Sequence, residues 1–252
     1  MYTTSFEELF SCIQNCLNKS NNKYILIHSD ITTLGKYIPK NETIIDDINE
    51  MIPGKTILLP GFTIKNFTHR FLYSPLEDRP EVGVLGELAR RRKWDRTNNP
   101  MHSMFLNKNC NLEAHTEFYS KMKTSSFGEN SLLASIQNDL TIIQIGCFHN
   151  TYVHRAEEIF GVNYRFKKKF NGEWVIKNNK GLICNEMLVR KKNLVGIEEK
   201  DRLHAAELFF ATDSVNIENI NNCKIKSFTA SNYLDFTLNK LKKNKNFLSS
   251  IT

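Results

Sequence analysis

Three short apolar runs along the chain predict buried β-strands. They occupy residues 23–28, 56–60 and 141–145. Each run is rich in isoleucine and leucine and is followed by glycine, proline or small polar residues, which commonly end a strand. The apolar positions are nearly continuous instead of alternating, as is typical of strands covered on both faces of a sheet. The pattern therefore favours an α/β fold with a buried sheet.

Apolar residues at helical spacing predict helices before and between these strands. The first helix begins near Ser5, and Glu8 three positions later completes the sequence pattern of a capping box. Further helices are expected around residues 84–93, 132–136 and 233–247. Residues 203–211 fit a helix or a strand, and the pattern leaves both open.

One hairpin is predicted after the third strand. Asn171 and Gly172 form a dipeptide that favours a tight two-residue turn. This turn would join residues 164–170 to residues 173–177 as two antiparallel strands. The first of these strands carries a cluster of basic side chains between Arg165 and Lys169.

The overall composition is that of a soluble globular protein. The chain has 252 residues, of which 40% are hydrophobic and 24% charged, enough to bury a substantial core. No apolar run approaches the roughly 20 residues that cross a bilayer, and the N-terminal residues lack the basic-then-apolar order of a signal peptide. We therefore expect a cytoplasmic protein with no membrane partner.

Charge is the compositional feature that narrows the choice of partners. The formal net charge is +7, which favours anionic partners over cationic ones. A basic nucleic-acid-binding protein is one hypothesis, but the basic runs lack interleaved aromatic residues and a recognition-helix pattern. We therefore favour a phosphorylated small molecule over nucleic acid as the partner.

The six cysteines form no recognisable metal motif. They stand at positions 12, 16, 110, 147, 184 and 223, with no Cys-x-x-Cys pair and no compact cluster with histidine. A metallohydrolase built on His149, His154 and Glu158 would need a different spacing and a third ligand, so we expect no metal. Cys147 could serve as a thiol nucleophile near these histidines, although a buried apolar role at a strand end is favoured.

The candidate catalytic residues directly follow the third strand. His154 and Glu157 stand three positions apart in a predicted helix, so the carboxylate can orient or charge-balance the imidazole. Thr151 or Asn150 can cap this helix and place His154 in its first turn. α/β folds usually keep their chemistry at the carboxyl ends of strands. His154 is thus a candidate general base; the alternative is a capped surface helix with an incidental histidine.

Several segments resemble, in the same order, the aminoglycoside 3-N-acetyltransferase family, which also includes acyltransferases acting on other amines. The segments are ILIHSDITTLG at 25–35, TILLPGFT at 56–63, the predicted helix at 84–93, RTNNPMHS at 96–103, SFGENSLL at 126–133 and IIQIGCFHNTYVHRAEE at 142–158. The family's threonine, histidine and glutamate at intervals of three match Thr151, His154 and Glu157. The resemblance implies a single acyltransferase domain over residues 1–252, with a layered α-β-α fold around a central mixed sheet.

The departures from the family pattern concern the acceptor. Where the family commonly shows Arg-Ser-x-His-Pro, this chain has Arg-Thr-Asn-Asn-Pro at 96–100. Glycine follows Pro60, where antibiotic-modifying members commonly have threonine. Residues 164–172 are more similar to members associated with polysaccharide or amino-sugar pathways. Aminoglycosides are polycations, which a basic protein would repel. We therefore expect an amino sugar linked to a nucleotide, used in surface polysaccharide synthesis; an aminoglycoside acceptor in antibiotic resistance is the alternative.

The resemblance also implies a mechanism, in which an amine attacks the thioester of acetyl-CoA directly and no acyl-enzyme forms. His154 would take a proton from the amine, because an imidazole with a reference pKa of about 6.5 is largely neutral near pH 7. Glu157 would orient the ring and stabilise its charged form, as the third group of a hydrolase triad does. The Thr151 hydroxyl, or a backbone N–H, would support the developing oxyanion.

Further residues are assigned to coenzyme A. The loop after the first strand would hold its pantetheine arm by analogy with the family, through Ser29, Thr32, Thr33 and Gly35. A second group of residues would bind its phosphates: Arg96, Thr97 and Ser103. The alternative for Arg96 is a structural role as an ion-pair partner.

The acceptor is assigned to residues near the catalytic turn. Arg165 and Lys167 would bind its phosphates, and Asn150 would contact it. The alternative for the two basic residues is a charged strand edge that discourages aggregation. A homodimer is left open by the sequence.

Overall fold

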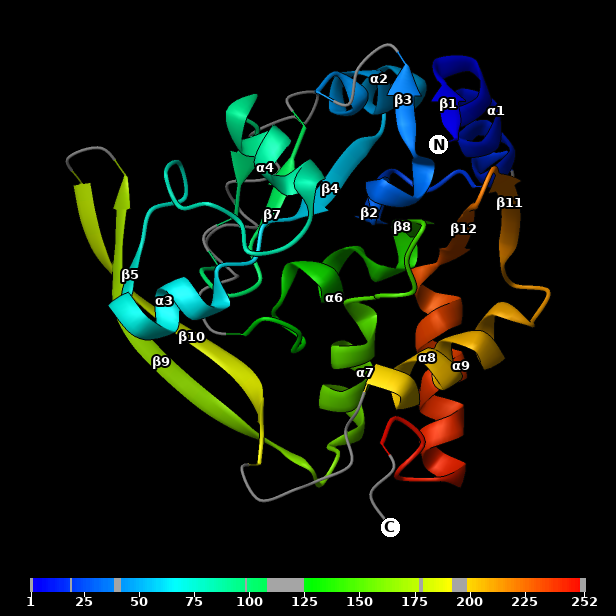
Figure 1. The fold of residues 1–252 in the computed structure, drawn as a ribbon. Helices are drawn as coiled ribbons and strands as arrows, with labels where there is room; N and C mark the ends of the chain where they lie inside the picture. Colours follow the sequence, from blue (N-terminus) through cyan, green and yellow to red (C-terminus); the bar gives the residue numbers. More distant parts are fainter. Residues whose placement is uncertain are drawn as a thin grey trace.

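The structure, a computed structural model, describes residues 2–18, 20–38, 42–97, 99–107, 125–176, 179–191 and 199–249. Its centre is a seven-stranded mixed sheet (Figure 1). From one edge to the other the sheet contains β11 (Asn216–Ile220), β12 (Cys223–Thr229), β8 (Leu140–Ile145), β2 (Tyr24–Ser29), β4 (Thr56–Pro60), β7 (Met104–Leu106) and β6 (Asp95–Arg96). The three predicted strands are confirmed as β2, β4 and β8, which are neighbours and run parallel.

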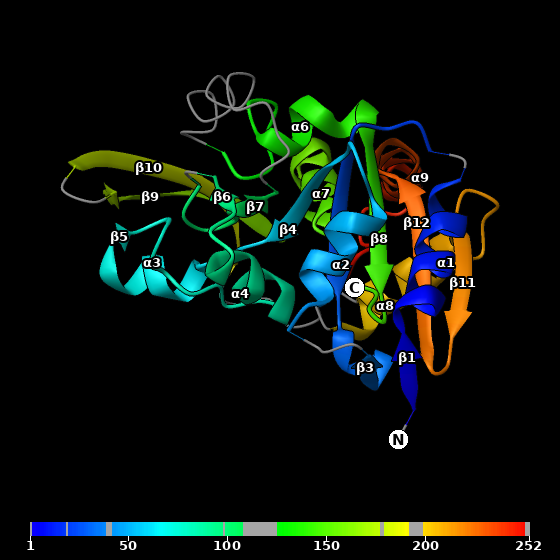
Figure 2. The same cartoon turned by 90° about the horizontal axis from the view of Figure 1, so that it is seen from above.

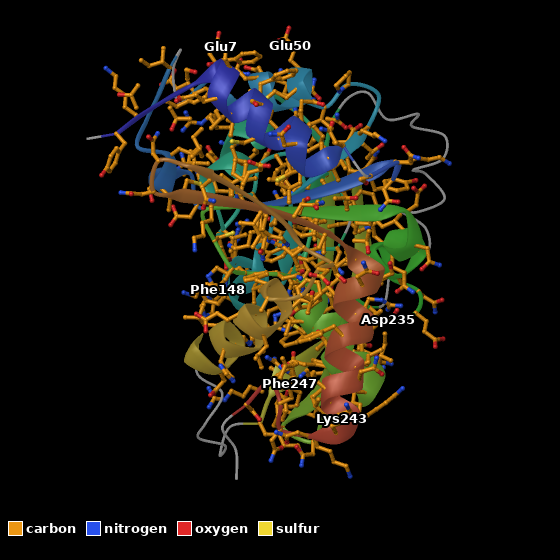
Figure 3. The ribbon with its side chains drawn as sticks, turned by 90° about the vertical axis from the view of Figure 1, so that its right-hand side faces the viewer. Glu7, Glu50, Phe148, Asp235, Lys243 and Phe247 are labelled. Carbon is orange, nitrogen blue, oxygen red and sulfur yellow. The ribbon has the colours of Figure 1, made fainter. Side chains whose placement is uncertain are left out.

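Helices cover both faces of this sheet, which confirms the layered α-β-α fold. One face carries α1 (Phe6–Leu17), α2 (Ile44–Met51) and α4 (Val84–Arg91). The other carries α6 (Leu132–Ile136), α7 (Tyr152–Phe160), α8 (Glu199–Phe210) and α9 (Ala230–Lys243). In Figure 3, Glu7 and Glu50 mark the first layer and Asp235 and Lys243 mark the second, with the sheet between them.

The sheet is buried on both sides because adjacent residues of a strand point to opposite faces. In β2, Ile25 and Ile27 pack with α1 and α2, whereas Leu26 between them packs with the helices of the other layer. Apolar residues are therefore needed at every position. This explains why the strands read as continuous apolar runs.

The remaining elements complete the two layers. Ser5 caps α1 as predicted, since Glu8 N donates to Ser5 Oγ at 3.2 Å and Ser5 N donates to Glu8 Oε2 at 2.8 Å. The smaller elements are β1 (Thr3–Ser5), which pairs with β3 (Lys36–Ile38), and the 3-10 helices η1 (Ile31–Leu34) and η2 (Gln137–Asp139). Residues 203–210, left open by the pattern, belong to helix α8. Within the described ranges, no helix is long and apolar enough to cross a bilayer.

The hairpin predicted at Asn171 and Gly172 is wrong. Both residues lie inside β9 (Arg165–Ile176), which pairs along its whole length with β10 (Asn179–Arg190). β5 (Leu72–Tyr73) joins the other edge of β9, and Figure 2 shows this three-stranded sheet extending away from the central one. The chain thus reverses several residues later than the dipeptide suggested, and Lys177, assigned to the second strand, lies outside the described residues.

Gly172 allows β9 to pack closely and does not form a turn. A Cβ at this position would overlap the carbonyl oxygen of Phe71 and lie 2.8 Å from the ring of Phe67. Phe67 belongs to α3 (Ile64–Arg70), and Phe71 follows it directly. Glycine therefore lets β9 approach the end of α3 closely.

Gly146, directly after β8, should be the glycine least able to accept a side chain. Its φ of +65° is a left-handed conformation, and a Cβ there would overlap Thr33 Oγ1 and lie 2.8 Å from Asp30 O. Backbone strain and overlap with a rigid loop should together make Gly146→Ala lower the free energy of unfolding by about 2–3 kcal/mol. Urea denaturation would measure this change.

Gly54→Ala is the matched control, because Gly54 has a φ of +72° and no atom within 4 Å of the added Cβ. This variant should lower the free energy of unfolding by only about 1 kcal/mol, the part due to backbone strain. Equal losses in the two variants would contradict the steric account of Gly146.

Candidate active site

A cavity of about 580 Å³ lies at the carboxyl ends of the parallel strands. It is lined by residues from strand ends and from α7, α8 and α9, including Ser29, Pro60, Gly146, Asn150, Thr151, His154, Arg202 and Tyr233. Phe148, which also lines it, lies beside α8 in Figure 3. Small-molecule sites commonly have this size and this place in an α/β fold. The cavity is therefore the candidate active site.

His154 and Glu157 meet on α7 as the spacing predicts. His154 Nδ1 lies 2.8 Å from Glu157 Oε2, and the Glu157 side chain is fully buried. An ionised carboxylate only accepts hydrogen bonds, so Nδ1 carries the ring proton and donates it. Nε2 of His154 is then unprotonated, and His154 lines the cavity. This is the tautomer that a general base needs.

Two arginines and a tyrosine surround Glu157. Arg165 Nε lies 2.8 Å from Oε2, Arg202 Nη2 lies 3.7 Å from Oε1, and the Tyr164 hydroxyl donates to Oε1 at 3.3 Å. Burial raises the pKa of Glu157, but the His154 hydrogen bond and the charges of Arg165 and Arg202 outweigh it and hold that pKa below its ordinary range. The carboxylate therefore stays ionised at neutral pH.

His154 itself is neutral at neutral pH. Burial lowers its pKa, Glu157 opposes that shift through its hydrogen bond and charge, and Arg202 and Arg165 add to the lowering. The ring packs against Phe127, with 5.3 Å between the ring centroids. Glu157 can stabilise the imidazolium that forms when the ring accepts a proton.

His28 is a site residue that the sequence analysis missed. It lies near the end of β2, directly before Ser29, is buried, and lines the cavity. Its Nε2 lies 2.7 Å from Thr151 Oγ1 and accepts from Thr151 N at 3.4 Å. Burial, and then the charge of His149, lower the pKa of His28 to about 3, so this imidazole is neutral. A histidine at the end of an apolar strand was the signal that could have found it.

Of the two residues expected to cap α7, the Asn150 side chain accepts a hydrogen bond from its first turn and the Thr151 side chain does not. Thr151 occupies the cap position without a side-chain cap hydrogen bond, because its hydroxyl contacts His28. Asn150 Oδ1 accepts from Tyr152 N at 3.0 Å instead. Asn150 Nδ2 is buried with no hydrogen-bond partner in the described part of the chain. Asn150 also lines the cavity, so this unpartnered nitrogen lies close to it.

The loop assigned to the pantetheine arm is only partly at the cavity. Ser29 and Asp30 line it. Thr32 and Thr33 instead hold the loop, since Thr32 Oγ1 donates to Asp30 Oδ1 at 2.5 Å and Thr33 Oγ1 donates to Asp30 O at 2.7 Å. Gly35 has a φ of +71° and lies against the backbone of Tyr2. These three residues shape the loop without facing the cavity.

The three residues assigned to coenzyme A phosphates do not line the cavity and make hydrogen bonds within the protein. Arg96, Thr97 and Ser103 are all buried. The Arg96 guanidinium donates to the carbonyl oxygens of Gly61, Pro75 and Asp78 and, at 3.0 Å, to Ser103 Oγ. Thr97 Oγ1 accepts from Met104 N at 3.0 Å. The Arg96 guanidinium therefore connects loops of the protein, and these hydrogen bonds occupy its N–H groups. Asn98 of this motif lies outside the described residues.

The two basic residues assigned to acceptor phosphates are paired with carboxylates. Arg165 is ion-paired with Glu157, as described above. Lys167 Nζ lies 3.2 Å from Glu158 Oε1 and 3.4 Å from Glu186 Oε1. The sequence showed these cations but not their partners. Lys167 thus has two acidic partners, whereas Arg165 shares Glu157 with Arg202.

Neither the thiol nor the metal alternative finds support. Burial raises the pKa of Cys147 to about 11, so its thiol is protonated and a poor nucleophile. Among the described residues no group of three or more histidine, cysteine, aspartate or glutamate side chains could hold a metal ion. Glu158, one of the three suggested ligands, pairs with Lys167 instead.

Solved structures match this chain over nearly all of its length, although no protein-family model and no curated protein matches the sequence. AAC-IIIb, solved in a binary complex with CoASH, is 18% identical with a TM-score of 0.76, over 96% of this chain and 97% of that one. AAC-VIa bound to sisomicin is 14% identical with a TM-score of 0.76, over 96% and 98%. The aminoglycoside acetyltransferase AAC(3)-Xa is 14% identical with a TM-score of 0.78, over 96% and 93%.

At these identities the similarity is one of fold. It extends over both helical layers and the central sheet, because at least 96% of this chain is covered in each comparison. The chain therefore has the fold of the aminoglycoside 3-N-acetyltransferases, as its sequence motifs predict.

Proposed function

We propose that the chain is an acetyl-CoA-dependent N-acetyltransferase, acting as a single cytoplasmic domain over residues 1–252. The observation that carries the proposal is the neutral His154 in the cavity, held through Nδ1 by a buried, ionised Glu157. This is the geometry of a general base with its orienting carboxylate. The fold shared with coenzyme A-bound and sisomicin-bound acetyltransferases supports the same chemistry.

The cavity offers features that suit acetyl-CoA, which would supply the acetyl thioester. Ser29 and Gly146 end two parallel strands and leave room for a narrow arm, and Asn150 Nδ2 is a donor without a partner in the described chain. Backbone and amide donors of this kind suit the amides of a pantetheine arm. We assign this arm to Ser29, as the resemblance implied, and to Asn150 in place of Thr32, Thr33 and Gly35, which do not line the cavity.

The reaction needs His154 for one proton. An alkyl amine is mostly protonated near pH 7 and must lose a proton before its nitrogen can attack. That first proton goes to solvent. As the neutral nitrogen attacks and the C–N bond forms, His154 Nε2 accepts a second proton from it, and His154 passes this proton to the departing thiolate as the C–S bond breaks. Glu157 stabilises the imidazolium in between. No side chain needs to become acetylated.

An amino sugar is the acceptor class that we propose, and an aminoglycoside has more support than a nucleotide-linked sugar. The neighbours include a structure bound to sisomicin and one in complex with a gentamicin. The case for a nucleotide rested on the net charge and on Arg165 and Lys167, which already contact Glu157, Glu158 and Glu186. Net positive charge alone is a weak argument, because local charges decide binding.

Turnover of an acceptor panel should separate the two acceptors. Purified protein with acetyl-CoA should release thiol with sisomicin or gentamicin at a kcat/KM at least about 10-fold above that with a nucleotide-linked amino sugar, since Arg165 and Lys167 already contact carboxylates. Thiol release and product mass would be measured. The reverse preference would favour the nucleotide-linked acceptor, and no turnover with any amine would contradict the proposed function.

A further inference from the structure

The contact between Thr151 and His28 fixes the direction of the Thr151 hydroxyl. His28 is buried and neutral, so only one of its two ring nitrogens carries a proton. The backbone N–H of Thr151 donates to Nε2 at 3.4 Å, which leaves the proton on Nδ1. Nε2 is therefore a pure acceptor.

Thr151 Oγ1 lies 2.7 Å from this same nitrogen. If the hydroxyl were not the donor, two lone pairs would face each other at hydrogen-bond distance. The single hydroxyl proton is thus directed at His28. Because a hydroxyl has one proton and two lone pairs, Thr151 can offer the cavity only an acceptor.

We propose that Thr151 Oγ1 accepts a hydrogen bond from the attacking amine, and that His28 is a positioning residue that holds the hydroxyl in this orientation. The proposal rests on the N-acetyltransferase function above. It replaces the expectation that the Thr151 hydroxyl donates to the thioester oxyanion, which a proton already given to His28 cannot do.

The positions of the two α7 side chains fit this role. Thr151 and His154 are three residues apart at the start of one helix, and both line the cavity. A neutral primary amine that attacks a carbonyl carries two N–H bonds beside its lone pair. His154 Nε2 receives one N–H and Thr151 Oγ1 receives the other, so the lone pair is aimed at the carbonyl carbon.

Thr151→Val tests the acceptor role, with Thr151→Ser as its matched control. Valine keeps the shape of threonine and leaves the Thr151 N–H to His28 in place, and melting temperatures would confirm the fold. For a primary amine, Thr151→Val should lower kcat about 10- to 100-fold, whereas Thr151→Ser should stay within about 3-fold. For the N-methyl derivative of the same acceptor, which has one N–H fewer, Thr151→Val should change kcat less than about 3-fold. Equal losses for both acceptors would overturn the proposal.

The carbonyl stretch of bound acetyl-CoA separates an acceptor from an oxyanion donor. With carbonyl-labelled acetyl-CoA and no amine present, the infrared band should be the same in wild type and Thr151→Val. A shift to higher frequency in the variant would show that Thr151 donates to the carbonyl and would overturn the proposal. This measurement needs only bound acetyl-CoA. It therefore decides the role of Thr151 even if the wild-type chain acetylates no amine, the result that would defeat the proposed function.

A double-mutant cycle tests the role of His28. His28→Phe should lower kcat for the primary amine about as much as Thr151→Val does. When His28→Phe is added to Thr151→Val, kcat should fall by less than a further ~2-fold. His28→Gln keeps an acceptor for the hydroxyl and should recover at least part of the activity. If the fold-loss in kcat of the double variant equals the product of the two single losses, His28 acts independently of Thr151, and this assignment is overturned.

Discussion

A His154→Gln variant should fold normally and lose about 10²- to 10⁴-fold in kcat for acetyl transfer, the usual contribution of a positioned general base. Glutamine is close in size to histidine and can still contact Glu157, but it cannot accept a proton from the amine. The ring now contacts Glu157 at 2.8 Å and packs against Phe127, so the site should keep its shape. Steady-state thiol release at saturating acetyl-CoA would measure the loss.

The matched control is His69→Gln, which changes an exposed histidine on α3 and should leave kcat within about 2-fold of wild type. The pH profile gives a second check. Because burial lowers the pKa of His154 below 6.5, the acid limb that His154 gives to kcat at saturating substrates should lie below pH 6.5, with activity falling as the ring becomes protonated. An unchanged kcat in a folded His154→Gln variant would defeat the proposed mechanism.

The features that the sequence predicted are those encoded by neighbouring residues. The apolar runs identified β2, β4 and β8 because a doubly covered strand needs apolar residues at every position. The Ser5–Glu8 capping box and the His154–Glu157 pair are both separated by three residues, so helical geometry alone brings each pair together. Local spacing was sufficient in each case.

The features that were missed depend on distant segments. His28 and Thr151 are 123 residues apart in sequence and meet only because β2 and β8 pair in parallel, which places their carboxyl ends side by side. Arg202 reaches Glu157 from α8, beyond the segments with family motifs. The sequence shows that Arg96 and Arg165 are charged, but it does not show that Arg96 is hydrogen-bonded to carbonyl oxygens or that Arg165 is ion-paired with Glu157. The predicted turn at Gly172 was wrong for a similar reason, because this position needs glycine for its close contact with Phe67 and Phe71.

Glu157→Gln should be the most destabilising single change at the site. The carboxylate has no exposed surface and balances Arg165 at 2.8 Å and Arg202 at 3.7 Å, so its loss leaves two largely buried cations without their counter-charge. Removing one partner of a buried ion pair typically costs about 3–5 kcal/mol in the free energy of unfolding. Glu158→Gln on the same helix is the matched control. The Glu158 side chain is 6% exposed, but its partner Lys167 is 56% exposed and stays hydrated after the change, so the loss should be well below that of Glu157→Gln, about 1 kcal/mol.

The pH dependence of this loss identifies the carboxylate charge as its cause. The folded-state pKa of Glu157 lies below the ordinary value, so its stabilisation is complete above the unfolded pKa of about 4.3 and disappears as the pH falls through the folded value. The difference in unfolding free energy between wild type and Glu157→Gln should therefore be constant from pH 7 to about 5 and shrink below pH 4. Chemical denaturation at several pH values would measure it. A difference that persists undiminished at pH 3 would show that packing, and not charge, sets the contribution of Glu157.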